Sequence, residues 1–295
     1  MFAIIGILVV FGAVVGGYLM EKGHILVLLQ PAELVIIAGA AAGTVLVANP
    51  THILKEILAG LMAAFGDTKY SKARYSELLQ MMFQVFNSAR RGGWAAVEGD
   101  IEEPAKSKIF SAYPAVTADH HMLAFICDSL RTAAIGAVEP FDLDQMMELD
   151  MDAHHHAAAE PVAALSTMAD SLPGLGIVAA VLGVVITMGA LGGPPEEIGH
   201  KVAAALVGTF LGILLCYGLV GPLAARMSKQ ADEEKACHHV LRVSITSFVK
   251  GTPPIVAVEM ARRAVPPHVR PKFKEVEDAC RSKRAEAAPA AAPAA

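Results

Sequence analysis

Five polar side chains that could take part in moving ions lie inside long apolar stretches of the sequence: Thr44, Thr187, Thr209, Cys216 and Tyr217. Their hydroxyl and thiol groups can form hydrogen bonds, but none of them titrates near neutral pH. Proton-driven machines normally use a carboxylate inside the membrane, and these apolar stretches contain no Asp or Glu. The sequence therefore leaves two alternatives: the protein moves no ions, or the ion-carrying carboxylate belongs to a partner.

Two prolines stand at similar depths in the last two apolar stretches. Pro222 removes the hydrogen bond that its amide would have donated to the Gly218 carbonyl, so we expect a kink or hinge there. Pro173 is expected at the start of a helix, where proline is tolerated and where Asp170 or Ser171 could act as the cap. A structural role is favoured for Pro173, whereas structural and functional roles stay equally open for Pro222.

Clustered histidines raise the question of a metal site. The segment MDAHHHAAAE offers His154, His155 and His156 together with Asp152 or Glu160. Consecutive residues of a helix point about 100° apart, so three successive histidines cannot face one ion. We therefore expect solvated side chains and no metal site. The same interpretation applies to the remaining histidine pairs, His120 with His121 and His238 with His239.

The composition indicates that these residues are carried by membrane helices. The chain has 295 residues, of which 54% are hydrophobic and only 18% charged, whereas soluble chains carry about 25% charged residues. Apolar stretches without ionisable residues run over Met1–Met20, Leu34–Ala48, Leu172–Gly193 and Val202–Ala225. We predict an all-α membrane protein with four transmembrane helices and a large helical cytoplasmic domain between spans 2 and 3.

The flanking charges predict the orientation of these spans. The first stretch begins MFAII, lacks a basic leader and is too long for a signal peptide, so a retained membrane helix is favoured. With four spans, the short external links near residues 21–33 and 194–201 hold only Lys22 and Lys201 among the 24 Lys and Arg residues. Lys55, Arg226 and Lys229 close to span ends agree with a cytoplasmic location of both termini.

Helical periodicity also predicts the polar segments. In SKARYSELLQMMFQVFNSARRGG, Leu78, Met82, Val85 and Ala89 share one face of an amphipathic helix that ends before two glycines. The segment HMLAFICDSLRTAAIGAV is apolar enough to pack inside a helical bundle, and DLDQMMELDMDAHHHAAA indicates a polar helix leading back to the membrane. The predicted organisation is 1–50 (spans 1 and 2), 51–169 (cytoplasmic), 170–226 (spans 3 and 4), 227–284 (cytoplasmic helices) and 285–295 (a disordered Ala/Pro tail).

Small residues and charges narrow the classes of partner. Pairs of glycines four residues apart predict close helix association, within one subunit or between subunits: Gly12 with Gly16, Gly39 with Gly43, and Gly208 with Gly212. A net charge of -5 with mixed signs argues against nucleic acid as the main partner. The four cysteines lack metal-ligand spacing and are expected to be reduced thiols.

Several motifs together carry a family resemblance. The stretches FGAVVGGYLMEKG, QPAELVIIAGA, EGDIEEP, DSLPGLGIVAAVLGVV and VGTFLGILLCYG resemble the flagellar motor stator A subunit family, MotA, from Met1 to about Glu259. This resemblance implies a non-enzymatic protein without cofactors in the bacterial inner membrane. It also implies that five A subunits surround two copies of the B subunit, MotB, whose aspartate carries the ion. The cytoplasmic part then pushes the rotor's switch protein, FliG.

The resemblance also assigns residues. Pro173 and Pro222 match the coupling prolines of the family, which link protonation of the partner carboxylate to cytoplasmic movement. Arg90 and Glu98 match the charged residues that engage the rotor, in the register fixed by the DIEEP motif.

The ion path is assigned in the same way. Thr209 matches a hydroxyl residue that lines the path, and Tyr217 lies nearby. Sodium-type relatives carry a threonine where this chain has Ala180, which offers no side-chain oxygen, so a proton-type stator is implied.

Two rival functions stay open on the sequence. The TolQ and ExbB class of proton-driven subunits resembles the last two spans, but it has three spans and lacks the Arg90 and Glu98 arrangement. A passive membrane scaffold without ion flow is the rival from a different class.

Overall fold

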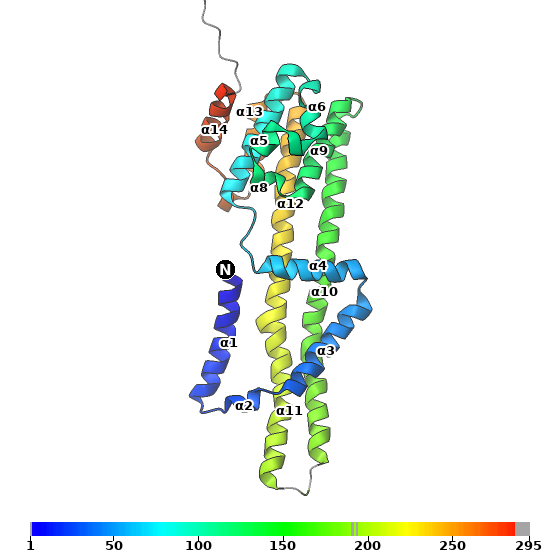
Figure 1. Ribbon diagram of the computed structural model, residues 1–295, viewed down its shortest axis with the longest axis vertical. Coiled ribbons are helices and arrows are strands. Elements are labelled where there is room, and N and C mark those ends of the chain that lie inside the picture. The colour runs from blue at the N-terminus through cyan, green and yellow to red at the C-terminus, as the bar shows by residue number, and fades with distance from the viewer. Residues whose placement is uncertain (1, 190–191, 193, 287–295) are drawn as a thin grey trace, which may run out of the picture. The chain divides into compact units, whose positions relative to one another are not determined.

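The computed structural model describes residues 2–189, 192 and 194–286, and every regular element in these ranges is helical (Figure 1). The elements up to the first long polar segment are α1 (Phe2–Met20), α2 (Ile25–Leu28), α3 (Pro31–Ala48), α4 (Thr51–Ala64), α5 (Lys72–Gly92), α6 (Ala95–Glu102), η1 (Pro104–Lys106), α7 (Lys108–Ser111), α8 (Pro114–Thr117) and α9 (His120–Ile135). They are followed by α10 (Pro140–Met188), α11 (Pro195–Leu215), η2 (Cys216–Val220), α12 (Gly221–Val249), α13 (Pro254–Ala264), η3 (Pro267–Val269) and α14 (Phe273–Glu286).

The chain forms two compact units. The span unit comprises Met1–Asp67 and His156–Ala231, and the bundle unit comprises Thr68–His155 and Asp232–Ala295. Helices α10 and α12 contribute residues to both units. The predicted boundary after residue 50 falls between α3 and α4, whereas the span unit continues through α4.

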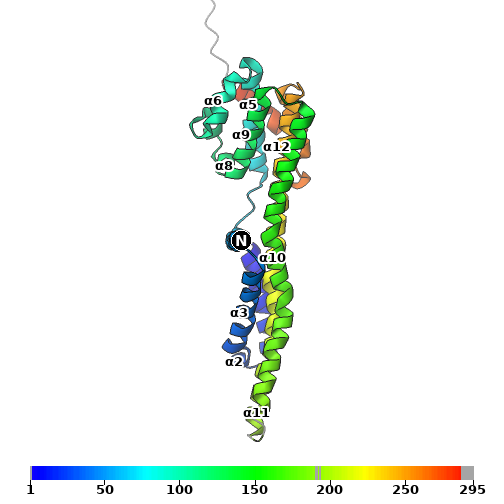
Figure 2. The same cartoon turned by 90° about the vertical axis from the view of Figure 1, so that its right-hand side faces the viewer.

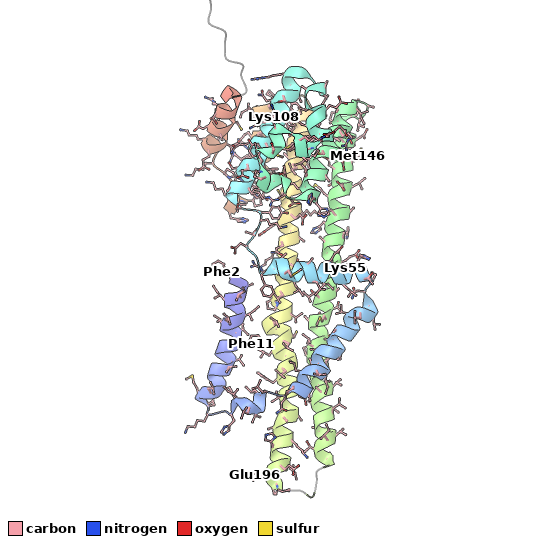
Figure 3. The ribbon with its side chains drawn as sticks, in the orientation of Figure 1. Phe2, Phe11, Lys55, Lys108, Met146 and Glu196 are labelled. Carbon is pink, nitrogen blue, oxygen red and sulfur yellow. The ribbon has the colours of Figure 1, made fainter. Side chains whose placement is uncertain are left out.

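Among the residues that the structure describes, four helices contain a segment long and apolar enough to cross a membrane. They fall within Phe2–Met20, Ile25–Ala48, Pro140–Met188 and Pro195–Val249, which confirms the predicted number of spans. No residue of α1 is buried within the described chain, and side chains such as Phe2 project outward from it (Figure 3). Its all-apolar sequence therefore presents its surface to lipid or to other subunits.

Helix α3 packs across α10 and α11 through residues four apart. Glu33, Ile37 and Ala41 are its buried residues, and Ile37 and Ala41 join a cluster with Leu172 of α10 and Cys216 of η2. Pro50 ends the span, and the amphipathic α4 then buries Ile53 and Ile57 against Leu165 and Met227. Within this unit, Figure 1 shows α3 beside α10, and α4 running across α12 and α10.

The bundle unit is built around α5. Leu78, Met82, Val85 and Ala89 are all buried, which confirms the predicted apolar face. The Ser71 hydroxyl caps the helix by accepting a hydrogen bond from the Arg74 amide at 3.3 Å. The neighbouring helices α6, α8, α9 and the end of α12 gather around it (Figure 2).

Helix α9 is also buried, as its apolar sequence predicts. Met122, Ile126 and Leu130 have no exposed surface, and Asp119 caps the helix by accepting a hydrogen bond from the Met122 amide at 3.3 Å. Gly136 ends it in the left-handed conformation, with φ of 70°, which favours glycine.

The expected helix start at Pro173 is wrong. Helix α10 continues for 49 residues from Pro140 to Met188, with Pro161 and Pro173 in its interior. The polar segment before the span is itself a good helix former, so the helix does not need to begin again at the membrane. Ser171 does not act as a cap, because its hydroxyl donates to the Met168 carbonyl at 2.7 Å.

The expected disturbance near Pro222 takes the form of a π-helical turn. Residues Cys216–Val220 form this turn, and the Gly221 amide donates to the Cys216 carbonyl five residues earlier. A Cβ added to Gly221 would lie 2.8 Å from that carbonyl oxygen, so glycine fits this position best. The Ala/Pro tail predicted at 285–295 lies outside the described residues except for its first two positions, which belong to α14.

Candidate ion path and torque surface

Helices α10 and α11 cross at very short range through glycines. A Cβ added at Gly176 would lie 2.8 Å from the Gly208 carbonyl oxygen, and one at Gly212 would lie 2.5 Å from the Leu172 carbonyl oxygen. Neither helix could carry a larger residue at these positions without moving away from the other. Of the glycine pairs predicted to associate helices, Gly208 and Gly212 therefore do so within the chain.

The other predicted glycine pairs have open space beside them. A Cβ added at Gly12, Gly16, Gly39 or Gly43 would meet no described atom within 4 Å. These positions do not pack helices together within the described part of the chain, which leaves their small surfaces available to other protein chains.

The crossing brings together two of the residues assigned to the ion path. A Cβ added at Gly208 would lie 3.1 Å from the Ala180 amide nitrogen, and one at Gly176 would lie 3.3 Å from the Thr209 Cα atom. Ala180 and Thr209 are both half-buried. Tyr217 lies apart from them in the π-helical turn, with 73% of its surface exposed.

A carboxylate that sequence reasoning placed outside the spans enters this crossing. Glu33 is 7% exposed, and its Oε2 atom would lie 2.6 Å from a Cβ added at Gly208. Its Oε1 atom would lie 3.4 Å from a Cβ added at Gly183 on α10. The apolar stretches themselves contain no Asp or Glu, but in the folded span unit the Glu33 carboxyl group lies between two of them.

The two prolines that the resemblance assigns to coupling have different surroundings. Pro173 is half-buried on α10, next to Leu172, whose carbonyl touches Gly212. Pro222 is exposed and lines a groove between α1 and α12 that also contains Phe2, Gly6, Ile7, Val10 and Gly218. Because the proline ring cannot donate a backbone hydrogen bond, each residue weakens its helix locally.

The bundle unit exposes both residues assigned to the rotor. Arg90 lies in the last turn of α5 and Glu98 in the first turn of α6, after a turn in which Gly93 has φ of 72°. Neither residue forms a hydrogen bond or ion pair with any residue that the structure describes. The two charges are therefore separate and free to meet a partner.

Charged groups around Glu98 are tied to one another instead. Glu98 borders a surface groove with Trp94, Ile101 and Ile135, into which Arg131 also projects. Arg131 donates to the two Glu102 oxygens at 2.6 and 3.2 Å, and these hydrogen bonds hold the pKa of Glu102 below its usual range. This pairing leaves Glu98 as the carboxylate of the groove without a basic partner in the described chain.

The histidines of α10 and α12 are not all solvated, which corrects the sequence-based expectation. His238 is only 4% exposed, and His154 is half-buried and lies 2.9 Å from the Glu234 carboxylate. The rings of His121 and His154 lie 5.0 Å apart. Among the described residues, no group of three side chains has the geometry of a metal site.

Comparisons with known proteins agree with this architecture. Residues 4–93 match the family described as Motility protein A N-terminal, and residues 117–238 match the MotA/TolQ/ExbB proton channel family. Motility protein A of Escherichia coli (strain K12) is 41% identical over 282 residues, covering 96% of each chain. The chain belongs to the MotA family.

Further relatives and solved structures extend the match. Motility protein A of Salmonella typhimurium is 39% identical, with 96% of each chain covered. The flagellar MotAB stator complex from Bacillus subtilis contains a chain that is 25% identical, with a TM-score of 0.71 over 87% of this chain and 92% of that one. The C. jejuni MotAB structure shares the fold, with a TM-score of 0.74, 17% identity, and 90% and 95% coverage.

The family match decides between the rival functions. The second family includes TolQ and ExbB, but the N-terminal match and the close relatives belong to motility protein A. This MotA family member is therefore a multi-pass membrane protein with four spans and a flagellar stator subunit of a proton channel family. It does not belong to an enzyme family.

Sequence reasoning missed Glu33 because the residue lies at the edge of its span. Glu33 stands in the first turn of α3, just before an uninterrupted apolar stretch. The sequence did contain a weak signal. A single acidic residue at the edge of a span needs a polar or charged neighbour, and Gly183 and Gly208 leave space in which its side chain could lie. The contact itself depends on how three helices cross.

Proposed function

We propose that this chain assembles with a MotB-type B subunit into a proton-driven stator whose bundle unit pushes the rotor. The observation that carries the proposal is the free, exposed pair of charges Arg90 and Glu98 on a chain that matches motility protein A over nearly its whole length. The relatives solved from Bacillus subtilis and C. jejuni are MotAB complexes, which supports a B subunit as partner. We also propose that five copies of this chain surround a dimer of the B subunit. The rotor protein that the bundle unit pushes is then the switch protein FliG.

The uncovered faces of the span unit support assembly with other chains. Helix α1 buries none of its residues in the described chain, and Val181 and Val185 on α10 are 54% and 62% exposed. Membrane helices associate through small residues and close packing. The open glycine pairs on α1 and α3 offer such surfaces to neighbouring subunits or to the B subunit.

The coupling step uses the two prolines. One charge that crosses a potential of about 100 mV releases about 2.3 kcal/mol. This energy suffices to shift a helix between two packings at a locally weakened site. Pro222 lies two residues after the end of the π-helical turn, and Pro173 is next to the Leu172–Gly212 contact, so both prolines lie where α10 and α12 can change their packing. Protonation of the B-subunit aspartate would then move the bundle unit through these helices.

The torque step uses Arg90 and Glu98. Exposed ion pairs contribute about 0 to 1 kcal/mol and are screened by salt. Weak pairs of this kind can form and break at each step while they still select the correct register with the rotor. Arg91 lies beside Arg90 and shares its exposure, so it is available to the same partner.

Proton coupling is proposed over sodium coupling. Sodium must be coordinated by several oxygens, and the Ala180 side chain offers none at a position where the crossing is tight. The proposed location is the bacterial inner membrane with both termini in the cytoplasm. Lys55 on α4 and Arg226 and Lys229 on α12 support this orientation, because they flank span ends on the same side.

Charge reversal tests the torque step. The variants Arg90→Glu and Glu98→Lys are expressed with the B subunit in a motile strain that lacks its own stators. We expect each variant to reach the membrane at the normal level and to reduce swimming speed strongly. Lys108→Glu on α7 is the matched control, because Lys108 is also exposed and unpaired in the described bundle unit. Normal torque after reversal of both Arg90 and Glu98 would remove the rotor contact from the proposal.

A further inference from the structure

The carboxyl group of Glu33 lies unpaired inside the apolar crossing of the span unit. The residue is 7% exposed, and its Oε2 atom is buried without a hydrogen-bond partner among residues 2–189, 192 and 194–286. A charged carboxylate in such surroundings is costly, and a neutral carboxyl without hydrogen bonds is also unfavourable. If the side chain at this position only filled space, Leu or Met would fill it without the free-energy cost of burying an unpaired carboxyl group.

Glycines create the space that the carboxyl group occupies. An alanine at Gly208 would place its Cβ 2.6 Å from Oε2, and an alanine at Gly183 would place its Cβ 3.4 Å from Oε1 and 2.7 Å from the Ala205 Cβ. These two glycines differ from Gly176 and Gly212, whose closest neighbours are backbone atoms of the opposite helix. The recess at Gly183 and Gly208 therefore contains a titratable side chain as well as a helix contact.

The recess lies within the membrane stretch and beside the assigned ion path. Gly183 stands inside the apolar stretch at 172–193 and Gly208 inside the stretch at 202–225, both free of ionisable residues. Ala180 and Thr209 border the same crossing. Glu33 itself follows the short external link that contains α2, so its position connects that link with the interior of the crossing.

We propose that Glu33 is a proton-relay residue of this subunit, which accepts a proton on the side of the α2–α3 link and passes it toward the ion path. In this step an O–H bond of a hydronium ion breaks, leaving water, and an O–H bond forms at one oxygen of the Glu33 carboxylate. The same O–H bond breaks when the proton leaves toward the carboxylate of the B subunit through water beside Thr209. No electrons are exchanged, and the Glu33 carboxyl returns to its starting state.

This inference rests on the proposed function, because a relay has a use only in a proton-driven complex. It adds a protonatable group of the A subunit to a path whose carrier is on the partner. At low load the motor turns quickly, so the rate of proton delivery through the relay limits the rotation rate. Near stall the mechanical load limits each step, so the relay has little effect there.

The test compares isosteric variants in the assembled stator. Glu33→Gln keeps the size and polarity of the side chain but cannot exchange a proton, and Glu33→Asp keeps the carboxyl group. Glu21→Gln is the matched control, because Glu21 lies exposed in the link after α1 and is unpaired in the described chain. Each chain is expressed with its B subunit in cells without other stators, and bead rotation is recorded at low and high load over a range of external pH.

The relay predicts a several-fold lower rotation rate of Glu33→Gln at low load, with near-normal torque at stall. It also predicts that Glu33→Asp keeps a dependence of speed on external pH that Glu33→Gln loses, whereas Glu21→Gln behaves as the unmodified chain. Equal speeds of Glu33→Gln and the unmodified chain at every load and pH would overturn the relay. Failure of both Glu33→Gln and Glu33→Asp to reach the membrane would also overturn it, in favour of a packing role. If the unmodified chain itself gives no rotation, the proposed function fails instead.

Discussion

At the scale of single residues, a histidine–glutamate pair joins α10 to α12 inside the bundle unit. His154 Nε2 lies 2.9 Å from Glu234 Oε1, and this hydrogen bond raises the pKa of His154. Burial raises the pKa of Glu234. The hydrogen bond and the charge of His154 lower this pKa by more than burial raises it, so the net shift is downward. Burial lowers the pKa of the neighbouring His238. The shifts of His154 and Glu234 both favour the ionic form of the pair, whereas burial favours the neutral form of His238.

These shifts predict that Glu234→Gln destabilises the bundle unit in a pH-dependent way. The pair contributes fully between the ordinary pKa values of Glu and His, 4.5 and 6.5, and its contribution is lost as pH rises through the raised pKa of His154. We expect a loss of about 1 kcal/mol at pH 6 and a smaller loss at pH 8. Trp94 is the only tryptophan and packs edge-on against Phe248 in the bundle unit, so its fluorescence in denaturant reports the unfolding.

The control for this measurement is Glu160→Gln. Glu160 is exposed on α10 and has no ion pair in the described part of the chain, so its substitution should change stability little at either pH. An equal loss for Glu234→Gln at pH 6 and pH 8 would contradict an ionic pair.

At the scale of helices, the crossing of α10 and α11 depends on glycines that cannot be enlarged. We expect Gly176→Ala to separate the helices, because its Cβ would lie 2.8 Å from the Gly208 carbonyl oxygen. Gly174→Ala, two residues earlier on α10, meets no atom within 4 Å and should be neutral or stabilising by up to about 1 kcal/mol. The measurement is the thermal stability of the purified complex in detergent, and equal melting temperatures of the two variants would disprove the close crossing.

The π-helical turn leads to a second prediction at this scale. Pro222→Ala restores a backbone donor next to Cys216–Val220, so we expect a regular, stiffer helix and weaker coupling of ion flow to movement. Swimming should fall while the membrane level of the protein stays normal. Pro195→Ala is the control, because Pro195 is exposed in the first turn of α11, where proline is tolerated. Wild-type swimming of Pro222→Ala would exclude a coupling role for this proline.

Local sequence patterns predicted the elements better than their contacts. Hydropathy and periodicity are properties of neighbouring residues, so the spans and the buried face of α5 followed from them. The continuation of α10 through Pro173 could not be predicted from these local patterns, because two strong helical segments on either side outweigh one missing hydrogen bond. The burial of Glu33 and His238 could not be predicted from local patterns either, because each side chain is covered by helices that are distant in sequence.

At the scale of the whole molecule, the span unit leaves large apolar side chains uncovered. Phe2 on α1 and Val47 on α3 are 82% and 91% exposed. Surfaces of this kind require lipid or other protein chains. The bundle unit has the opposite character, with an apolar core and a charged surface. The chain thus combines a unit made for membrane assembly with a unit made for contact in water.

The choice of driving ion depends on the oxygens that the crossing of α10 and α11 provides. The crossing is bordered by Thr209 and the Glu33 carboxyl, and Ala180 adds no side-chain oxygen, so few side-chain ligands are present for a dehydrated sodium ion, whereas a proton can move through water. We expect a protonophore to stop rotation in cells that contain this chain and its B subunit, and an imposed sodium gradient not to restore it. Rotation sustained by the sodium gradient alone would show that oxygens from the partner complete a sodium site. In that case Ala180 would not set the choice of ion.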